Sequence, residues 1–83
     1  MGYTCTKCKR SVYGELVEKT VLCETRKQMI QWAYKHKRRT NTVELHIQDR
    51  DGDLVYFFRS APPVEEMYRK DGTMAHRTNE MGL

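Results

Sequence analysis

The feature that most constrains this fold is a predicted β-hairpin centred on Asp51-Gly52. Residues 42–48 alternate between apolar and polar side chains, which is typical of a half-buried strand. Asp-Gly is a favoured pair for a two-residue type I′ turn, and a turn with Arg50 opposite Asp53 sets the register of the two strands. That register pairs Ile47 with Tyr56, Leu45 with Phe58 and Val43 with Ser60 on the core face, and Glu44 with Arg59, His46 with Phe57 and Gln48 with Val55 on the outer face.

A helix is predicted upstream of this hairpin, over residues 26–39. The run lacks Gly and Pro, and Thr25 is placed to cap its N-terminus. Apolar residues recur in it at helical spacing. Projection at about 100° per residue turns one face toward the sheet and a basic face away from it. The first face carries Met29, Ile30, Ala33 and His36, and the second carries Lys27, Gln31, Lys35 and Arg38.

The remaining segments complete a predicted α+β fold. Residues 13–23 are rich in Val, Leu, Thr and Tyr and are predicted to form a strand, while Pro62-Pro63 is predicted to open a short helix that ends near Lys70. We therefore expect a small antiparallel or mixed sheet with one main helix packed on one face. Residues 1–70 would form the single domain, and residues 71–83 a flexible C-terminal tail. The expected core is Val17, Val21, Met29, Ile30, Ala33, Val43, Leu45, Ile47, Leu54, Tyr56 and Phe58.

Length and composition exclude several classes of protein. A chain of 83 residues has room for one core, and 39% hydrophobic with 31% charged residues is typical of a globular, soluble protein. No stretch approaches the ~20 apolar residues that span a bilayer, and the first residues lack the apolar core of a secretory signal. We expect a cytoplasmic protein without a membrane partner. The odd number of cysteines, three, argues against a disulfide framework and agrees with that location.

Part of the chain resembles a known family. The stretch Cys23-Glu24-Thr25-Arg26-Lys27-Gln28-Met29-Ile30-Gln31-Trp32-Ala33, followed by Val43-Glu44-Leu45-His46-Ile47 and Asp49-Arg50-Asp51-Gly52, is similar to the small YegP-like bacterial and phage domains of unknown function. In those domains a Thr-capped helix leads into a hairpin that turns on Asp-Gly. The resemblance covers about half of the chain and implies a fold but no activity. The cysteines and several large side chains of this sequence depart from the family's pattern.

The cysteines form a candidate metal site. Cys5 and Cys8 have the spacing of a zinc knuckle, in which two thiolates on a tight turn share one ion. Residues 3–12 would form this segment, Cys23 would supply a third ligand, and His36 or His46 a fourth. The alternatives are reduced thiols in a partly ordered N-terminus, or redox chemistry, which favours a helix N-terminus that the strand-like residues after Cys8 do not supply.

Charge is divided unevenly along the chain. Residues 1–40 carry a net charge of +7 and residues 41–83 a net charge of −3, so an anionic partner should approach the first half. Basic side chains attract phosphate, and an aromatic side chain beside them can stack on an unpaired base. The candidate nucleic-acid or anion contacts are Lys7, Lys9, Arg10, Lys27, Trp32, Lys35, Arg38 and Arg39. The competing interpretation is a solvated helix end whose basic residues complement the helix dipole.

No catalytic constellation or glycine-rich phosphate loop is present, so we expect no enzyme and no small-molecule substrate. Phe57 faces outward in the predicted hairpin, and with Met67 and Tyr68 it forms a candidate protein-contact surface. The first hypothesis is therefore a small protein-binding regulator or inhibitor, of a size compatible with phage or mobile-element origin. The alternative is a nucleic-acid-binding module that uses the basic helix face, with or without a stabilising zinc ion.

Overall fold

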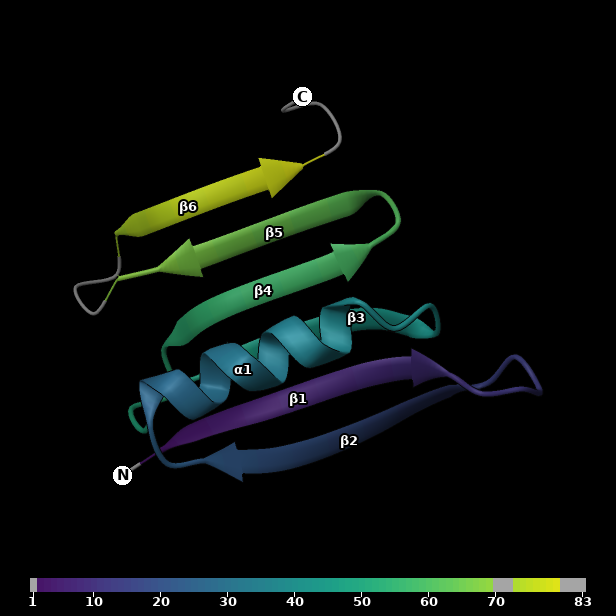
Figure 1. Ribbon diagram of the computed structural model, residues 1–83, viewed down its shortest axis with the longest axis horizontal. Helices are drawn as coiled ribbons and strands as arrows, with labels where there is room; N and C mark the ends of the chain where they lie inside the picture. The colour runs from purple at the N-terminus through teal and green to yellow at the C-terminus, as the bar shows by residue number, and fades with distance from the viewer. Residues whose placement is uncertain (1, 70–72, 80–83) are drawn as a thin grey trace.

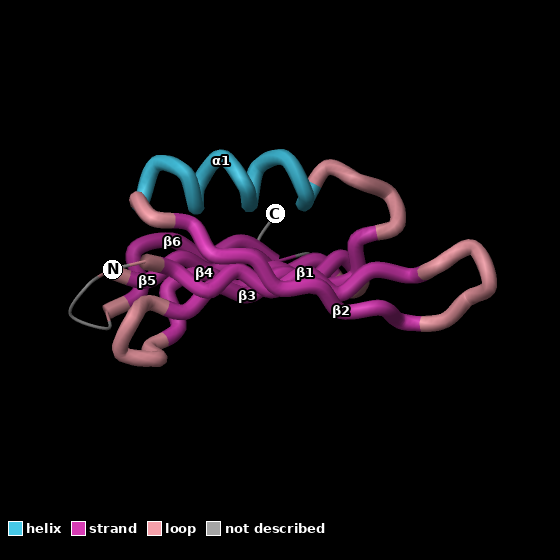
Figure 2. The backbone as a smooth tube through the Cα atoms, turned by 90° about the horizontal axis from the view of Figure 1, so that it is seen from below, coloured by secondary structure: helices cyan, strands magenta, loops and turns pink. Residues whose placement is uncertain are grey.

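The computed structural model describes residues 2–69 and 73–79. Six strands form one sheet in the order β2-β1-β3-β4-β5-β6, and every neighbouring pair is antiparallel (Figure 1). The single helix, α1, lies over one face of the sheet, and no helix covers the other face within the described part of the chain (Figure 2). The elements are β1 (Tyr3–Arg10), β2 (Leu16–Cys23), α1 (Arg26–Lys37), β3 (Thr42–Gln48), β4 (Leu54–Ser60), β5 (Pro63–Tyr68) and β6 (Met74–Asn79).

The predicted α+β fold is wrong, because the chain is mostly β. The segment after Pro62-Pro63 is not a short helix but β5, which returns along β4 after a turn that contains a cis Ala61–Pro62 peptide bond. Residues 74–79, expected in a flexible tail, form β6 on the outer side of β5. Each added strand gives hydrogen-bond partners to the open edge of the preceding one, a tertiary gain that local propensity does not register.

The hairpin of β3 and β4 keeps most of its predicted register. Tyr56 lies opposite Ile47, Phe58 opposite Leu45, Phe57 opposite His46 and Arg59 opposite Glu44, as expected. A bulge then places Leu54, and not Val55, opposite Gln48. The turn is longer than predicted, because the Asp49 N–H donates to the Asp53 carbonyl and Gly52, at φ +86°, occupies the left-handed position of a three-residue loop.

The predicted N-terminal cap of α1 is confirmed. The Thr25 side chain accepts a hydrogen bond from the Gln28 N–H, and the Gln28 side chain accepts from the backbone at Thr25, which completes a capping box. The helix ends at Lys37, two residues before the predicted end. No helix among the described residues has the length and apolar character needed to cross a membrane.

The core lies between α1 and the middle strands of the sheet. Its buried members are Cys5, Cys23, Met29, Ala33, Leu45, Ile47, Val55 and Tyr56. Three residues expected there are exposed instead: Val21, Ile30 and Leu54. Val21 lies on β2, an edge strand, and is exposed, whereas Cys5 is buried because residues 3–10 form β1 in the interior of the sheet.

Candidate anion-binding site

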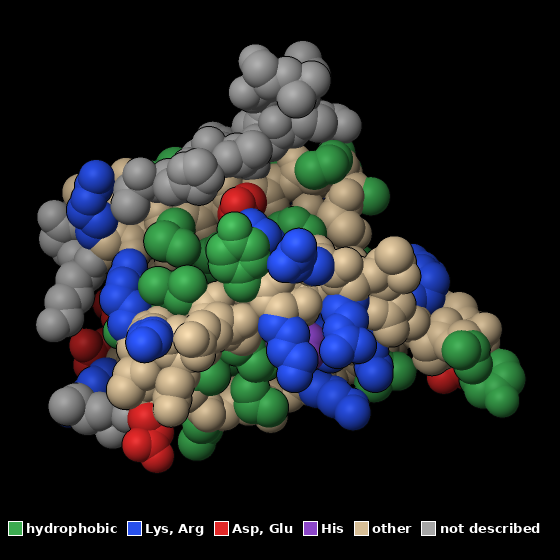
Figure 3. Space-filling view, viewed as in Figure 1, with side chains coloured by type: hydrophobic (Ala, Val, Ile, Leu, Met, Phe, Trp, Pro, Cys, Tyr) green, Lys and Arg blue, Asp and Glu red, His purple; other side chains and the backbone are tan. Residues whose placement is uncertain are grey.

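A cluster of cations surrounds His36 near the C-terminal end of α1. Lys7 projects from β1 toward the helix, and its Nζ lies 3.1 Å from His36 Nδ1. Lys19 lies directly opposite Lys7 on β2, and Lys9 lies two residues further along β1. Basic side chains gather around a histidine in the space-filling view of this face (Figure 3). Four other cations lower the pKa of Lys7 or His36 through their positive charge. Together with Lys7 we call them the cationic patch: Lys7, Lys9, Lys19, Lys35 and Arg39.

The electrostatics of the patch are mutually repulsive. Burial, and then the positive charges of Lys9, Arg39, Lys19 and Lys35, lower the pKa of Lys7 below its ordinary value. Burial, followed by the neighbouring cations of the patch, likewise lowers the pKa of His36. Both groups therefore lie in a region of positive potential that favours their neutral forms. An anion placed among these side chains would relieve that repulsion.

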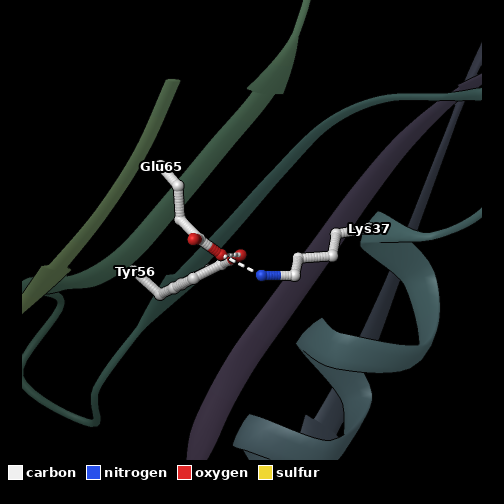
Figure 4. Close-up of polar contacts among 3 residues, drawn as sticks. All are labelled: Lys37, Tyr56 and Glu65. Atoms are coloured by element: carbon white, nitrogen blue, oxygen red, sulfur yellow. Dashed lines mark hydrogen bonds and ion pairs between the residues drawn. The ribbon is translucent and has the colours of Figure 1, made fainter. Parts of the chain in front are cut away.

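The opposite side of α1 shows how a lysine is neutralised in this protein. Lys37 Nζ lies 2.6 Å from Glu65 Oε2, and the buried Tyr56 hydroxyl donates to the same oxygen at 2.6 Å (Figure 4). Burial, and then this hydrogen bond, raise the pKa of Tyr56, so its hydroxyl stays protonated and continues to donate. The contacts join α1 to β4 and β5 and help to fix the helix end beside the patch.

A groove continues the cationic patch beyond the end of α1. It has a volume of about 880 Å³ and lies between the β1–β2 hairpin and the segment that joins α1 to β3. Lys9 and Lys19 line the hairpin side, and residues 40–43 line the other side. The groove therefore offers a concave, positively charged path that leads away from His36.

The structure brings together five of the eight predicted anion contacts. Lys7, Lys9, Lys35 and Arg39 belong to the patch, and the Trp32 ring lies beside that of His36, with centroids 4.9 Å apart. The other three predicted contacts lie outside the patch, although Arg10 lines the groove that continues it. Lys27 is in the first turn of α1, Arg10 donates to the Gly14 carbonyl, and Arg38 lies over the Tyr34 ring. Lys19 is the patch residue that sequence reasoning missed.

The predicted zinc ligands do not meet at one point. Cys5 and Cys8 belong to one extended strand, where side chains three residues apart project to opposite faces. Cys5 is buried under α1 and its Sγ lies 3.5 Å from that of Cys23, but His36 contacts Lys7. The alternative fourth ligand also fails, because His46 lies beside Glu44 on the face opposite the helix. The knuckle-like geometry expected for residues 3–12 is thus replaced by a sheet strand.

Three aspartates form the only close group of metal-type ligands in the part of the chain that the structure describes. Their carboxylate oxygens lie within 4.8 Å of one another in the turn of the β3–β4 hairpin. Asp49 Oδ1 accepts hydrogen bonds from the backbone N–H groups of Asp51 and Asp53. This arrangement explains the aspartates as turn formers.

The candidate protein-contact residues divide between the two faces of the sheet. Phe57 lies opposite Glu66 on β5, on the face without the helix, and Tyr68 projects to that face as well. Met67 projects to the other face and packs against the core. The three side chains therefore do not form one continuous surface.

Comparison with known proteins gives no assignment: no family model, curated protein or solved structure matches this chain. The resemblance to YegP-like domains stays a prediction.

Proposed function

We propose that this protein binds nucleic acid through the cationic patch. The observation that carries the proposal is the convergence of four cations on His36, from β1, α1 and the segment that follows α1, with Lys19 of β2 acting on one of them, Lys7. Lys7 and Lys19 lie directly opposite each other in the β1–β2 pair, an arrangement of like charges that destabilises an antiparallel sheet. The phosphates of a nucleic acid would attract both lysines and offset their mutual repulsion, and the release of counterions from the phosphates would add a favourable entropy of binding.

The hypothesis of a protein-binding regulator or inhibitor stays a prediction with less support. Its three contact residues fall on two faces of the sheet, whereas the patch lies on one face and leads into a concave groove. A cytoplasmic location, which is also a prediction, would give the protein access to nucleic acid.

The test measures the anisotropy of labelled DNA and RNA oligonucleotides over a series of salt concentrations. The patch variant carries Lys9→Gln, Lys19→Gln and Lys35→Gln. A matched control carries Arg26→Gln, Lys27→Gln and Arg50→Gln, three exposed cations away from the patch, so that both variants lose the same net charge.

We expect wild-type protein to bind at about 0.15 M salt. The slope of log K against log salt should fall by about 2 in magnitude in the patch variant, since each lost phosphate contact on a single strand contributes about 0.7. The control variant should keep most of the wild-type slope. Equal losses in both variants, or no binding by the wild type, would contradict the proposal.

A further inference from the structure

The turn between β1 and β2 carries the most exposed hydrophobic side chains of the described chain. Val12 is 93% exposed and Tyr13 is 88% exposed. The turn projects past the end of the sheet, and hydrophobic side chains stand clear of the body of the molecule there (Figures 1 and 3). These two residues therefore contribute almost nothing to the core.

This turn is built by a dense set of hydrogen bonds. The Ser11 N–H donates to the Glu15 carbonyl at 2.7 Å, and the Gly14 N–H donates to the Ser11 carbonyl at 3.0 Å. The Ser11 hydroxyl accepts from the N–H groups of both Tyr13 and Glu15 at 3.2 Å. Gly14 adopts φ +85°, a backbone conformation that residues with a side chain rarely adopt. The Tyr13 backbone is consequently held in one place.

The second hairpin of the protein provides an internal comparison. Its turn has the same design, with Asp49 accepting two backbone N–H groups and Gly52 at φ +86°. The two residues at its tip are Arg50 and Asp51, which are exposed and polar. Turn geometry therefore does not require Val12 and Tyr13, and their apolar character needs another reason.

The position of Tyr13 relative to the cations suggests that reason. Val12, next to it in the chain, lines the groove of about 880 Å³ together with Lys9 and Lys19. At about 3.3 Å per residue along a strand, Tyr13 lies within about 13 Å of Lys9 along the chain. A phosphate backbone bound by the lysines would hold its bases near the exposed ring.

We infer that Tyr13 is a stacking platform for an unpaired base and that the partner is single-stranded nucleic acid. This inference rests on the proposed function and deepens it. An aromatic side chain next to a positively charged groove is the combination that single-strand binding uses, because every base has a face that can stack. Bases in a duplex are already stacked on each other and offer no such face.

A lipid bilayer would also attract lysines and an exposed tyrosine, but the shape of the site argues against it. The cations line a concave groove and surround His36 at the helix end, which a flat membrane surface does not enter. A flexible chain of nucleotides can follow the groove from the patch to the tip of the turn.

The test compares Tyr13→Ala with Tyr13→Phe, which keeps the ring, and with Leu22→Ala, which truncates an exposed hydrophobic side chain that does not line the groove. Each protein is titrated against a labelled single strand of about 16 nucleotides, the longest site of a single-strand-binding module, and against the matching duplex. Anionic phosphatidylserine vesicles provide a third arm. Because the replaced side chains are exposed, the fold should be unaffected, and circular dichroism checks this.

We expect Tyr13→Ala to weaken single-strand binding about 5- to 150-fold, the effect of losing one stacked base, and to leave duplex binding unchanged. Tyr13→Phe and Leu22→Ala should bind the single strand as wild type does. In a Tyr13→Trp variant that also carries Trp32→Phe, the emission of the added tryptophan should be quenched by the single strand.

Two results would overturn this inference while leaving the proposed function intact. One is an unchanged single-strand affinity in Tyr13→Ala together with a normal effect of the patch variant. The other is an equal loss of single-strand and duplex binding in Tyr13→Ala. If the first result came with a loss of vesicle binding in Tyr13→Ala, the partner of Tyr13 would be a membrane. Failure of the wild type to bind either nucleic acid would refute both proposals.

Discussion

Oxidation of the buried cysteine pair tests the packing of β1 against the end of β2. Cys5 and Cys23 have their sulfur atoms 3.5 Å apart. A thiol oxidant such as diamide should remove two protons and two electrons from this pair and join the sulfurs in a disulfide. The bond would close a loop between positions 18 residues apart, which by the loop-entropy relation stabilises the protein by about 3 kcal/mol at 25 °C. For a domain of this size that corresponds to a rise in Tm of roughly 10–25 °C, less any strain.

The reaction should be slow at neutral pH and faster in alkali. Burial, and then the hydrogen bond to Cys23, raise the pKa of the Cys5 thiol to about 12, so little Cys5 thiolate is available as the attacking form. The experiment uses a Cys8→Ser background to exclude crosslinks through Cys8, and it compares thermal unfolding of the oxidised and reduced protein. Intact mass confirms the loss of two hydrogens.

The matched control adds Cys5→Ser to the same background and should show no change in mass or Tm after oxidation. If the Cys8→Ser protein forms no internal disulfide, or forms one that lowers Tm, the side-by-side placement of the two thiols is wrong.

Two further predictions concern stability. Tyr56→Phe removes the hydrogen bond to Glu65 but leaves Lys37 in place, so the free energy of unfolding in urea should fall by about 1–2 kcal/mol. Tyr34→Phe, at an exposed ring, should leave that free energy unchanged. Equal stability of the two variants would contradict the geometry in Figure 4. His36 has a lowered pKa in the folded state and one near 6.5 when unfolded, so the unfolded state binds more protons between these values, and stability should decrease as pH falls below about 6.5. His36→Gln should flatten that part of a pH series of urea titrations; an unchanged profile would show that His36 is not the group responsible.

The hairpin of β3 and β4 and the cap of α1 could be predicted because each is encoded locally. Alternation on one strand and an Asp-Gly turn fix which residues face each other, and Thr25 with Gln28 satisfies the first N–H groups of the helix. The bulge at Gln48 could not be seen, since it inserts one residue without changing the pattern upstream of it.

Strands β1, β5 and β6 were not predicted, for a different reason. Residues 3–10 were interpreted through their Cys-x-x-Cys spacing, which favours a metal knuckle, although Ser11 and Gly14 carry the same turn signal as Asp49 and Gly52. Recognition of that turn would have paired the two strands and placed Lys19 opposite Lys7. β5 and β6 depend on a neighbouring strand edge, which no local pattern reveals.

Basic residues in the last turn of a helix are common, because they complement the negative end of its dipole, and this alone would explain Lys35. It does not explain the lysines of β1 and β2, which come from two strands and converge on the same helix end. The adjacent rung of that strand pair places Thr6 opposite Thr20, on the other face of the sheet, and their hydroxyls form a neutral hydrogen bond of 3.3 Å. The β1–β2 pair can therefore accommodate a stabilising neutral pair, yet it carries two opposed lysines at the rung that faces the helix. Repulsion confined to that face agrees with the nucleic-acid binding that we propose, and a solvated helix end does not account for it.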